Sequence, residues 1–252
     1  MSATTRRAGT AAEGRRGKGD DTVLGDKKLS LTHLVREPGR AGRTAPPLLL
    51  LLHGIGSNED DLFGLAPYLD ERFLIVSARA PVALPYGGYG WFQIEFTPRG
   101  MIADVEQARK SLSILPGFVD ELVETYGPDR RRVYLAGFSQ GAMMSLALVL
   151  TRPEKIAAVA AMSGRLPGQV LELEPDREAL SGKPVLVTHG LYDPVLPIDD
   201  GRAVRDYLAS LPVALTYREY PMQHEVSVES LRDVTRWLTK ALDARPGDSR
   251  EE

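Results

Sequence analysis

The sequence contains no cysteine among its 252 residues. Disulfide bonds, thiolate metal sites and a cysteine nucleophile are therefore excluded. The chain also lacks a run of eighteen apolar residues, which a membrane-spanning helix would need, and its N-terminus lacks the apolar segment of a secretory signal. These absences are compatible with a reducing compartment. We therefore expect a cytoplasmic protein with no integral membrane segment.

The sequence also lacks a strong excess of one charge, since its net charge is -3. The charged residues are, however, unevenly distributed along the chain. The first nineteen residues hold five basic groups and one acidic group, a local charge of +4, which leaves -7 on the rest of the chain. Because nucleic-acid surfaces are basic, we expect no nucleic-acid partner. Residues 1–25 are basic and interrupted by glycine, which predicts a disordered tail, and residues 244–252 are expected to be a frayed C-terminus.

The strongest functional signal lies in Arg131 to Leu150. The apolar run Val133–Ala136 predicts a buried strand, and Ala142–Leu150 predicts a buried helix. Between them, the segment GFSQG has the G-x-S-x-G pattern centred on Ser139. The glycines permit a sharp turn that projects the serine hydroxyl beside the helix N-terminus, where an oxyanion would be stabilised. Ser139 is therefore the candidate nucleophile.

Strand and helix patterns alternate through most of the chain. Strands are expected at 27–36 (at the sheet edge), 48–52, 73–78, 133–136, 156–162, 184–187 and 213–220, and helices at 60–69, 102–126, 142–150, 199–208 and 226–242. This alternation predicts an α/β fold with a mostly parallel central sheet and helices on both faces. We expect one domain spanning residues 26–243.

A serine nucleophile needs a general base and a carboxylate that orients the base. The chain has four histidines; His33 lies inside a predicted strand, whereas His53, His189 and His224 all follow strands. Position alone does not choose among these three, because chemistry gathers at the loops after strands. In hydrolases built on this serine turn, the chain order is serine, acid, histidine. That order excludes His53, and His189 would leave little chain for an acid.

His224 is therefore the expected general base, and Asp193 is the expected acid. Asp193 falls between the serine and His224 in sequence, in a loop that follows a strand. Asp199 and Asp200 are rivals, but they stand at the start of a predicted helix, where aspartate caps free N–H groups.

Two further loops have unusual composition. His53-Gly54-Ile55 follows five consecutive leucines, and its glycine would let backbone N–H groups approach a substrate oxygen closely. Residues 84–92 contain two Tyr, one Trp, one Phe and three Gly. These aromatic side chains either line an apolar pocket or pack onto the core, and the sequence leaves both alternatives open.

Four motifs together resemble one known family. HGIGSNEDDL, GFSQGA, LYDPVLP and YPMQHE are similar to motifs of the phospholipase/carboxylesterase family of α/β-hydrolases, which includes small bacterial carboxylesterases and acyl-protein thioesterases. The resemblance covers about Leu48 to Leu242. It implies an α/β-hydrolase fold and a Ser139–His224–Asp193 catalytic triad.

The resemblance also implies roles for backbone and pocket groups. The oxyanion hole would use the backbone N–H groups of Ile55 and Gln140, and Trp91 with Phe92 would lie near the acyl pocket. Two positions depart from the family pattern, because Gln93 replaces a common acidic residue and Gln223 replaces a glycine before the histidine. These departures bear on substrate preference more than on reaction type.

The expected function is hydrolysis of small-molecule carboxylic esters or thioesters with small to medium acyl groups, through an acyl-enzyme. No metal or organic cofactor is expected, and the family allows a monomer or a homodimer. One alternative is a lysophospholipase or protein deacylase with a long acyl channel; another is a catalytically silent binding module. A deep channel near Trp91 and Phe92 would favour the lysophospholipase or deacylase. The complete set of triad residues argues against the silent binding module.

Overall fold

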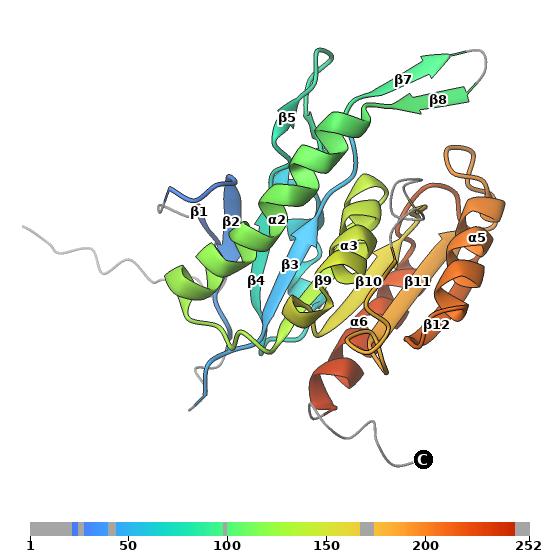
Figure 1. Ribbon diagram of the computed structural model, residues 1–252. Coiled ribbons are helices and arrows are strands. Elements are labelled where there is room, and N and C mark those ends of the chain that lie inside the picture. Colours follow the sequence, from blue (N-terminus) through green and yellow to red (C-terminus); the bar gives the residue numbers. More distant parts are fainter. Residues whose placement is uncertain (1–21, 25–27, 40–43, 98–99, 167–173, 245–252) are drawn as a thin grey trace, which may run out of the picture.

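An eight-stranded sheet forms the centre of the computed structural model (Figure 1), which describes residues 22–24, 28–39, 44–97, 100–166 and 174–244. The strands, in their order across the sheet, are β1 (Thr22–Leu24), β2 (His33–Arg36), β4 (Leu74–Ala78), β3 (Leu48–Leu52), β9 (Val133–Phe138), β10 (Ala158–Met162), β11 (Pro184–Gly190) and β12 (Ala214–Tyr220). The strands from β4 to β12 are parallel, whereas β1 and β2 are antiparallel.

Helices cover both faces of this sheet (Figure 1). The helical segments are α1 (Glu59–Phe63), η1 (Ala66–Tyr68), α2 (Val105–Tyr126), α3 (Gln140–Thr151), η2 (Pro153–Lys155), α5 (Ile198–Ala209) and α6 (Val228–Asp243). The longest of them, α2, is amphipathic, and within the described ranges no helix combines the length and apolar character needed to cross a bilayer. The expected mostly parallel α/β architecture is confirmed.

The five leucines of β3 show how the two layers are separated. All five are buried, and successive side chains point to opposite faces of the strand. Leu50 belongs to the apolar cluster shared with α2, α3 and α5. Leu49 and Leu51 belong to the second cluster, which includes residues of α1 and α6. An unbroken apolar run is therefore the pattern of a central strand covered on both sides.

The N-terminal part of the sheet differs from the prediction. The expected edge strand over 27–36 is shorter, because β2 begins at His33, and it is not the edge, because β1 pairs with it through Val23 and Val35. Residues 22–24 of the expected tail thus belong to the sheet. A three-residue strand is too short for its alternation to be recognised in sequence. Residues 1–21 and 245–252 lie outside the described residues.

Two predicted helices also differ at their beginnings. The helix expected from 102 begins at Val105, because residues 100–103 form strand β8, which pairs with β7 (Ile94–Thr97) in a hairpin. The Asp104 carboxylate accepts a hydrogen bond from the Gln107 N–H at 2.9 Å, which caps the helix at this point. The helix expected over 60–69 is divided into α1 and η1, which are separated by Gly64 and Leu65.

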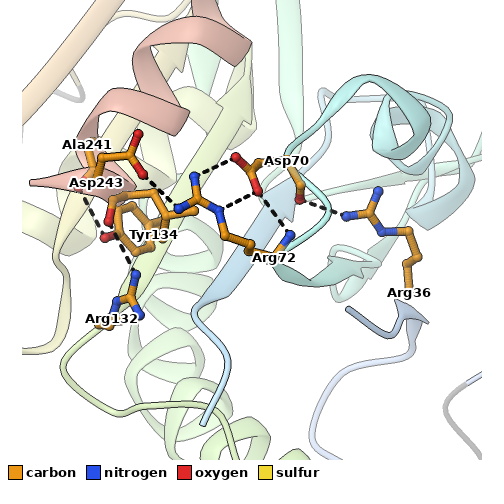
Figure 2. Close-up of polar contacts among 8 residues, drawn as sticks. Arg36, Asp70, Arg72, Arg132, Tyr134, Ala241 and Asp243 are labelled. Carbon is orange, nitrogen blue, oxygen red and sulfur yellow. Dashed lines mark hydrogen bonds and ion pairs between the residues drawn. The ribbon is translucent and has the colours of Figure 1, made fainter. Parts of the chain in front are cut away.

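The C-terminal end of α6 is tied to the turn before β4 by a cluster of polar contacts (Figure 2). The Arg72 guanidinium lies between Asp70 and Asp243, with N–O distances of 2.8 and 2.7 Å. Arg36 donates to the backbone oxygen of Asp70 at 3.0 Å. These contacts join segments far apart in sequence at the C-terminal end of α6.

Candidate active site

Ser139 occupies a single-residue turn between β9 and α3, since β9 ends at Phe138 and α3 begins at Gln140. Its backbone has φ 54° and ψ -116°, a conformation that residues with a Cβ adopt at an energetic cost. The surrounding sheet holds this conformation, and the Ser139 N–H donates to the Met162 carbonyl of the neighbouring strand at 2.9 Å. The hydroxyl therefore lies at the carboxyl end of the sheet and beside the N-terminus of a twelve-residue helix.

The two glycines of the G-x-S-x-G pattern are required by close backbone approach. A Cβ on Gly137 would lie 2.3 Å from the Gly141 carbonyl oxygen, and one on Gly141 would lie 1.8 Å from the Leu52 carbonyl oxygen. Both separations are far below van der Waals contact, so a larger residue at either position would force strand and helix apart. The sequence pattern is thus explained by packing on both sides of the serine.

The structure brings together the three residues expected to form the triad. Ser139 Oγ lies 3.0 Å from His224 Nε2, and His224 Nδ1 lies 2.7 Å from Asp193 Oδ2. Because a carboxylate oxygen accepts hydrogen bonds, Nδ1 carries the proton and Nε2 has its lone pair directed at the serine hydroxyl. This geometry allows His224 to remove the serine proton.

Asp193 is buried in a turn that satisfies its second oxygen. Oδ1 accepts the backbone N–H groups of Val195 and Leu196 at 2.9 and 2.8 Å, which leaves Oδ2 for His224. The carboxylate therefore has a fixed orientation and three hydrogen-bond donors.

The loop that carries His224 packs tightly against the loop that carries Asp193. Leu191 N–H donates to the Tyr220 carbonyl at 2.8 Å, and Tyr192 N–H donates to the Met222 carbonyl at 3.1 Å. A Cβ on Gly190 would approach the Gln223 carbonyl oxygen within 2.4 Å. The His224 ring also contacts the Phe138 ring, with a centroid distance of 4.9 Å. The alignment of acid and base is thus set by backbone contacts between neighbouring strand ends.

The other histidines and acids considered in the sequence lie outside this triad. His33 Nε2 is bonded to the Tyr126 hydroxyl at 2.8 Å. His53 accepts the Ala80 N–H at 3.0 Å, and burial lowers the pKa of its imidazole. The Asp199 side chain is 91 % exposed at the beginning of α5, and Asp200 lies in the same first turn. His189 is buried beside Asp193, at a position that sequence reasoning did not connect with the acid.

The predicted oxyanion loop lies against Ser139. A Cβ on Gly54 would be 3.3 Å from Ser139 Cβ. Just beyond Ile55, the loop is bridged to the aromatic segment, because Gly56 N–H donates to the Tyr89 carbonyl and Tyr89 N–H donates to the Ser57 carbonyl, both at 2.8 Å. Gln140 is the first residue of α3, so its N–H has no acceptor within the helix.

The Gln140 side chain connects the serine turn to the aromatic loop. This buried carboxamide accepts the Trp91 N–H at 2.9 Å and donates to the Phe92 carbonyl at 2.8 Å. The Trp91 indole N–H in turn donates to the His53 carbonyl at 3.0 Å. No local pattern in the sequence indicates this role, because the partners lie almost fifty residues apart. Trp91 and Phe92 are only 0 % and 4 % exposed and belong to the core cluster; their role as acyl-pocket walls stays a prediction.

A partly buried ion pair supports the same loop. Arg79 donates to the Glu59 carboxylate, and its guanidinium also stacks on the Tyr89 ring at 4.6 Å. Burial alone would raise the pKa of Glu59, but hydrogen bonding and the charge of Arg79 outweigh burial and lower it. The loop is therefore anchored by a charged pair as well as by its backbone bonds.

A cleft of about 490 Å³ opens between the turn of the β5 (Val82–Ala83) and β6 (Tyr89–Gly90) hairpin and the base of the β7–β8 hairpin. It is lined by Pro85, Tyr86, Gln93, Ile94, Glu95, Ile102, Ala103 and Asp104. Neither Trp91 nor Phe92 is among the lining residues. Over the part of the chain that the structure describes, no three potential metal ligands converge.

The fold and the serine turn define an α/β-hydrolase. Residues 39–242 match the phospholipase/carboxylesterase family, and the chain belongs to this family.

Individual relatives agree with this assignment. A probable carboxylesterase, SOBER1-like, of Arabidopsis thaliana is 28 % identical over 90 % of this chain and 89 % of its own length. Acyl-protein thioesterase 1 of Kluyveromyces lactis is 29 % identical, over 79 % of this chain and 93 % of its own. The crystal structure of the Bacillus cereus carboxylesterase superposes with a TM-score of 0.73 at 25 % identity, covering 84 % of this chain and 95 % of that one.

Proposed function

We propose that this protein is a serine hydrolase that cleaves carboxylic esters or thioesters of small to medium acyl groups through an acyl-enzyme intermediate. The observation that carries the proposal is the continuous line of hydrogen bonds from Ser139 through His224 to Asp193, at 3.0 and 2.7 Å. The names of the relatives, carboxylesterases and acyl-protein thioesterases, agree with an acyl substrate.

In the proposed mechanism, His224 accepts the Ser139 proton as the serine oxygen attacks the carbonyl carbon. Asp193 keeps the imidazole in the required tautomer and stabilises the imidazolium that forms. The leaving alcohol or thiol then takes the proton from His224. Water attacks the acyl-enzyme by the same route, and the serine hydroxyl is regenerated.

The negative charge of each tetrahedral intermediate develops on the former carbonyl oxygen. We assign its stabilisation to the backbone N–H groups of Ile55 and Gln140, since Gly54 lies against Ser139 and Gln140 begins α3. One such donor contributes on the order of 3 kcal/mol to transition-state stabilisation. The N-terminus of α3 adds a favourable dipole at the same point.

The burial of the aromatic pair supports the preference for short acyl groups. Trp91 and Phe92 are buried in the core, and the Trp91 indole N–H is bonded to the His53 carbonyl, so both side chains are closely packed. The alternative function, a lysophospholipase or protein deacylase, would need space for a long chain. For this alternative, the cleft near the β7–β8 hairpin is a candidate site for the chain.

The test is hydrolysis of p-nitrophenyl esters from acetyl to palmitoyl by the wild type and by Ser139→Ala. We expect turnover by the wild type with an optimum at short or medium acyl length, and its loss in the variant. Equal turnover by both proteins would disprove the serine mechanism. An optimum at palmitoyl would instead favour the long-chain alternative.

A further inference from the structure

His189 is a buried histidine that the proposed mechanism does not use. It is part of β11, and its ring lies against the triad acid. Nε2 is 3.7 Å from Asp193 Oδ2 and 2.8 Å from the Leu196 carbonyl oxygen. The side chains of both His189 and Asp193 are inaccessible to solvent.

The surroundings of the ring define which nitrogen carries the proton. A carbonyl oxygen can only accept a hydrogen bond, so Nε2 is protonated and donates to Leu196. Nδ1 is buried and has no hydrogen-bond partner among the described residues. A proton on Nδ1 would lack an acceptor, so the ring is the neutral tautomer with its proton on Nε2. His189 is therefore not a second general base.

Leu196 connects this ring to the acid. Its N–H donates to Asp193 Oδ1 at 2.8 Å, while its carbonyl accepts from His189 Nε2 at 2.8 Å. Leu196, which donates a hydrogen bond to Asp193 Oδ1, is thus itself hydrogen-bonded to His189. The other carboxylate oxygen, Oδ2, bonds to His224 and faces the His189 N–H edge.

Helix α5 leaves the ring no freedom to move away. Gly201 packs directly on it, and a Cβ there would lie 2.6 Å from both Nδ1 and Cγ of His189. A glycine in a helix interior weakens the helix, so its presence here is explained by the close approach of the imidazole. The ring is therefore fixed between the helix and the acid turn.

We propose that His189 is a positioning residue of the catalytic site. Its neutral Nε2–H holds the 193–196 turn through Leu196 and keeps the Asp193 carboxylate aligned with His224. It touches neither substrate nor the reacting atoms and acts only through the acid. The inference rests on the proposed function, since it presupposes that the triad is the catalytic machinery.

The test compares His189→Leu, which keeps much of the volume but has no donor, with His189→Gln, whose amide nitrogen can reach the Leu196 carbonyl. We expect His189→Leu to lower kcat about tenfold or more while KM changes less than about twofold, because a transition-state alignment is lost. His189→Gln should recover most of the lost kcat. If the role of His189 is purely structural, His189→Gln should recover no kcat, and the loss of kcat in each variant should follow its loss of melting temperature. That result would overturn the proposal.

Two further measurements separate positioning from packing. In the Asp193→Asn background, His189→Leu should lower kcat no further, because its effect passes through the carboxylate; a full additional loss would contradict the proposal. The low-field proton resonance of the His224 Nδ1–H to Asp193 hydrogen bond should shift or broaden in His189→Leu and return in His189→Gln. An unchanged resonance in His189→Leu would also overturn it.

The resonance reports on alignment without any turnover. If the wild type hydrolyses none of the esters, the proposed function fails, and the resonance still decides whether His189 positions the acid. Should His189→Leu not fold, Gly201→Ala provides the second variant. Its added methyl would displace the ring, and it should alter the same resonance and lower kcat; wild-type behaviour of a folded Gly201→Ala would count against the proposal.

Discussion

Gln140 and Trp91 are hydrogen-bonded across 49 residues of sequence, with the Gln140 carboxamide oxygen 2.9 Å from the Trp91 nitrogen. Gln140, which follows Ser139, therefore contributes to the candidate site in two ways. Its backbone begins α3 beside Ser139, and its side chain holds the loop that is bridged to the oxyanion segment. The two sides of the proposed oxyanion hole are thus connected through this buried amide and the aromatic loop that it holds.

Replacing this amide should reduce both stability and turnover. Gln140→Leu would leave the buried Trp91 N–H and Phe92 carbonyl without partners, and each unpaired group costs about 1–3 kcal/mol. We expect the free energy of unfolding to fall by about 2–4 kcal/mol and kcat to fall with it, measured by urea titration and ester hydrolysis. Gln107→Leu is the matched control, since it removes one bond to Gln93 in the same loop; it should lower stability less and leave kcat near normal.

Removing the charge of the acid should leave the fold but not the activity. In Asp193→Asn the amide can no longer favour the imidazole tautomer that accepts the serine proton, and turnover should fall by about 10⁴. The circular dichroism spectrum and melting temperature should stay close to those of the wild type. The control is Asp199→Asn, whose side chain is exposed, with unchanged turnover expected. Near-normal turnover of Asp193→Asn would mean that another carboxylate orients His224.

The glycines of the chain should differ sharply in their tolerance of alanine. Gly141→Ala places a Cβ 1.8 Å from the Leu52 carbonyl oxygen, and we expect a protein that does not fold or that loses turnover. Gly117 lies in the interior of α2, and the position that a Cβ would occupy there has no neighbouring atom within 4 Å. Gly117→Ala should therefore raise the free energy of unfolding by about 0.5–1 kcal/mol, measured by thermal unfolding. A soluble, fully active Gly141→Ala protein would contradict the packing argument for the serine turn.

The contacts of Arg72 predict a pH-dependent part of the stability (Figure 2). The hydrogen bond from Arg72, opposed by burial, lowers the pKa of Asp70 to about 2. A carboxyl with a pKa lower in the folded than in the unfolded state stabilises the protein above its unfolded pKa of about 3.9, and this contribution is lost as pH falls toward 2.

We expect Asp70→Asn to lose about 1 kcal/mol at neutral pH, allowing for solvent screening of the half-exposed Arg72, which corresponds to about 2–4 °C in melting temperature. The difference from the wild type should shrink between pH 4 and pH 2. Asp243→Asn is the control; because this carboxylate is more than half exposed, its effect should be small at every pH. A difference that stays constant down to pH 2 would show that the charge of Asp70 is not the cause.

The N-terminal boundary can be measured by truncation. Deleting residues 1–20 should leave melting temperature and ester turnover unchanged, because their composition predicts little buried surface. Deleting residues 1–24 removes β1, which pairs with β2 at three positions, and should lower the melting temperature. A large loss of stability in the shorter truncation would show that the basic segment packs on the domain.

The sequence by itself determined the family and most of the architecture, and it indicated the three residues of the proposed triad. Ser139, Asp193 and His224 could be chosen because each stands in a short motif after a strand. Chain order argued against the other histidines, and the helix-start position of Asp199 and Asp200 argued against these rival acids. The central strands of the parallel sheet could be recognised because they are buried on both faces, so that they form continuous apolar runs such as that of β3. The edge strand β12 is mostly not buried, and its alternating pattern indicated it instead. These motifs and apolar runs are local signals, since each consists of a few neighbouring residues.

Only the tertiary structure decided which distant groups meet. Three contacts join segments whose own sequences do not indicate the partner. They are the bond between Gln140 and Trp91, the packing of Gly201 on His189, and the pairing of Val23 with Val35. The same holds for the β7–β8 hairpin before α2, where side-by-side pairing overrides the helical spacing that begins at Ile102. Contacts of this kind depend on how the strands and loops are arranged in three dimensions, and the local sequence pattern does not specify that arrangement.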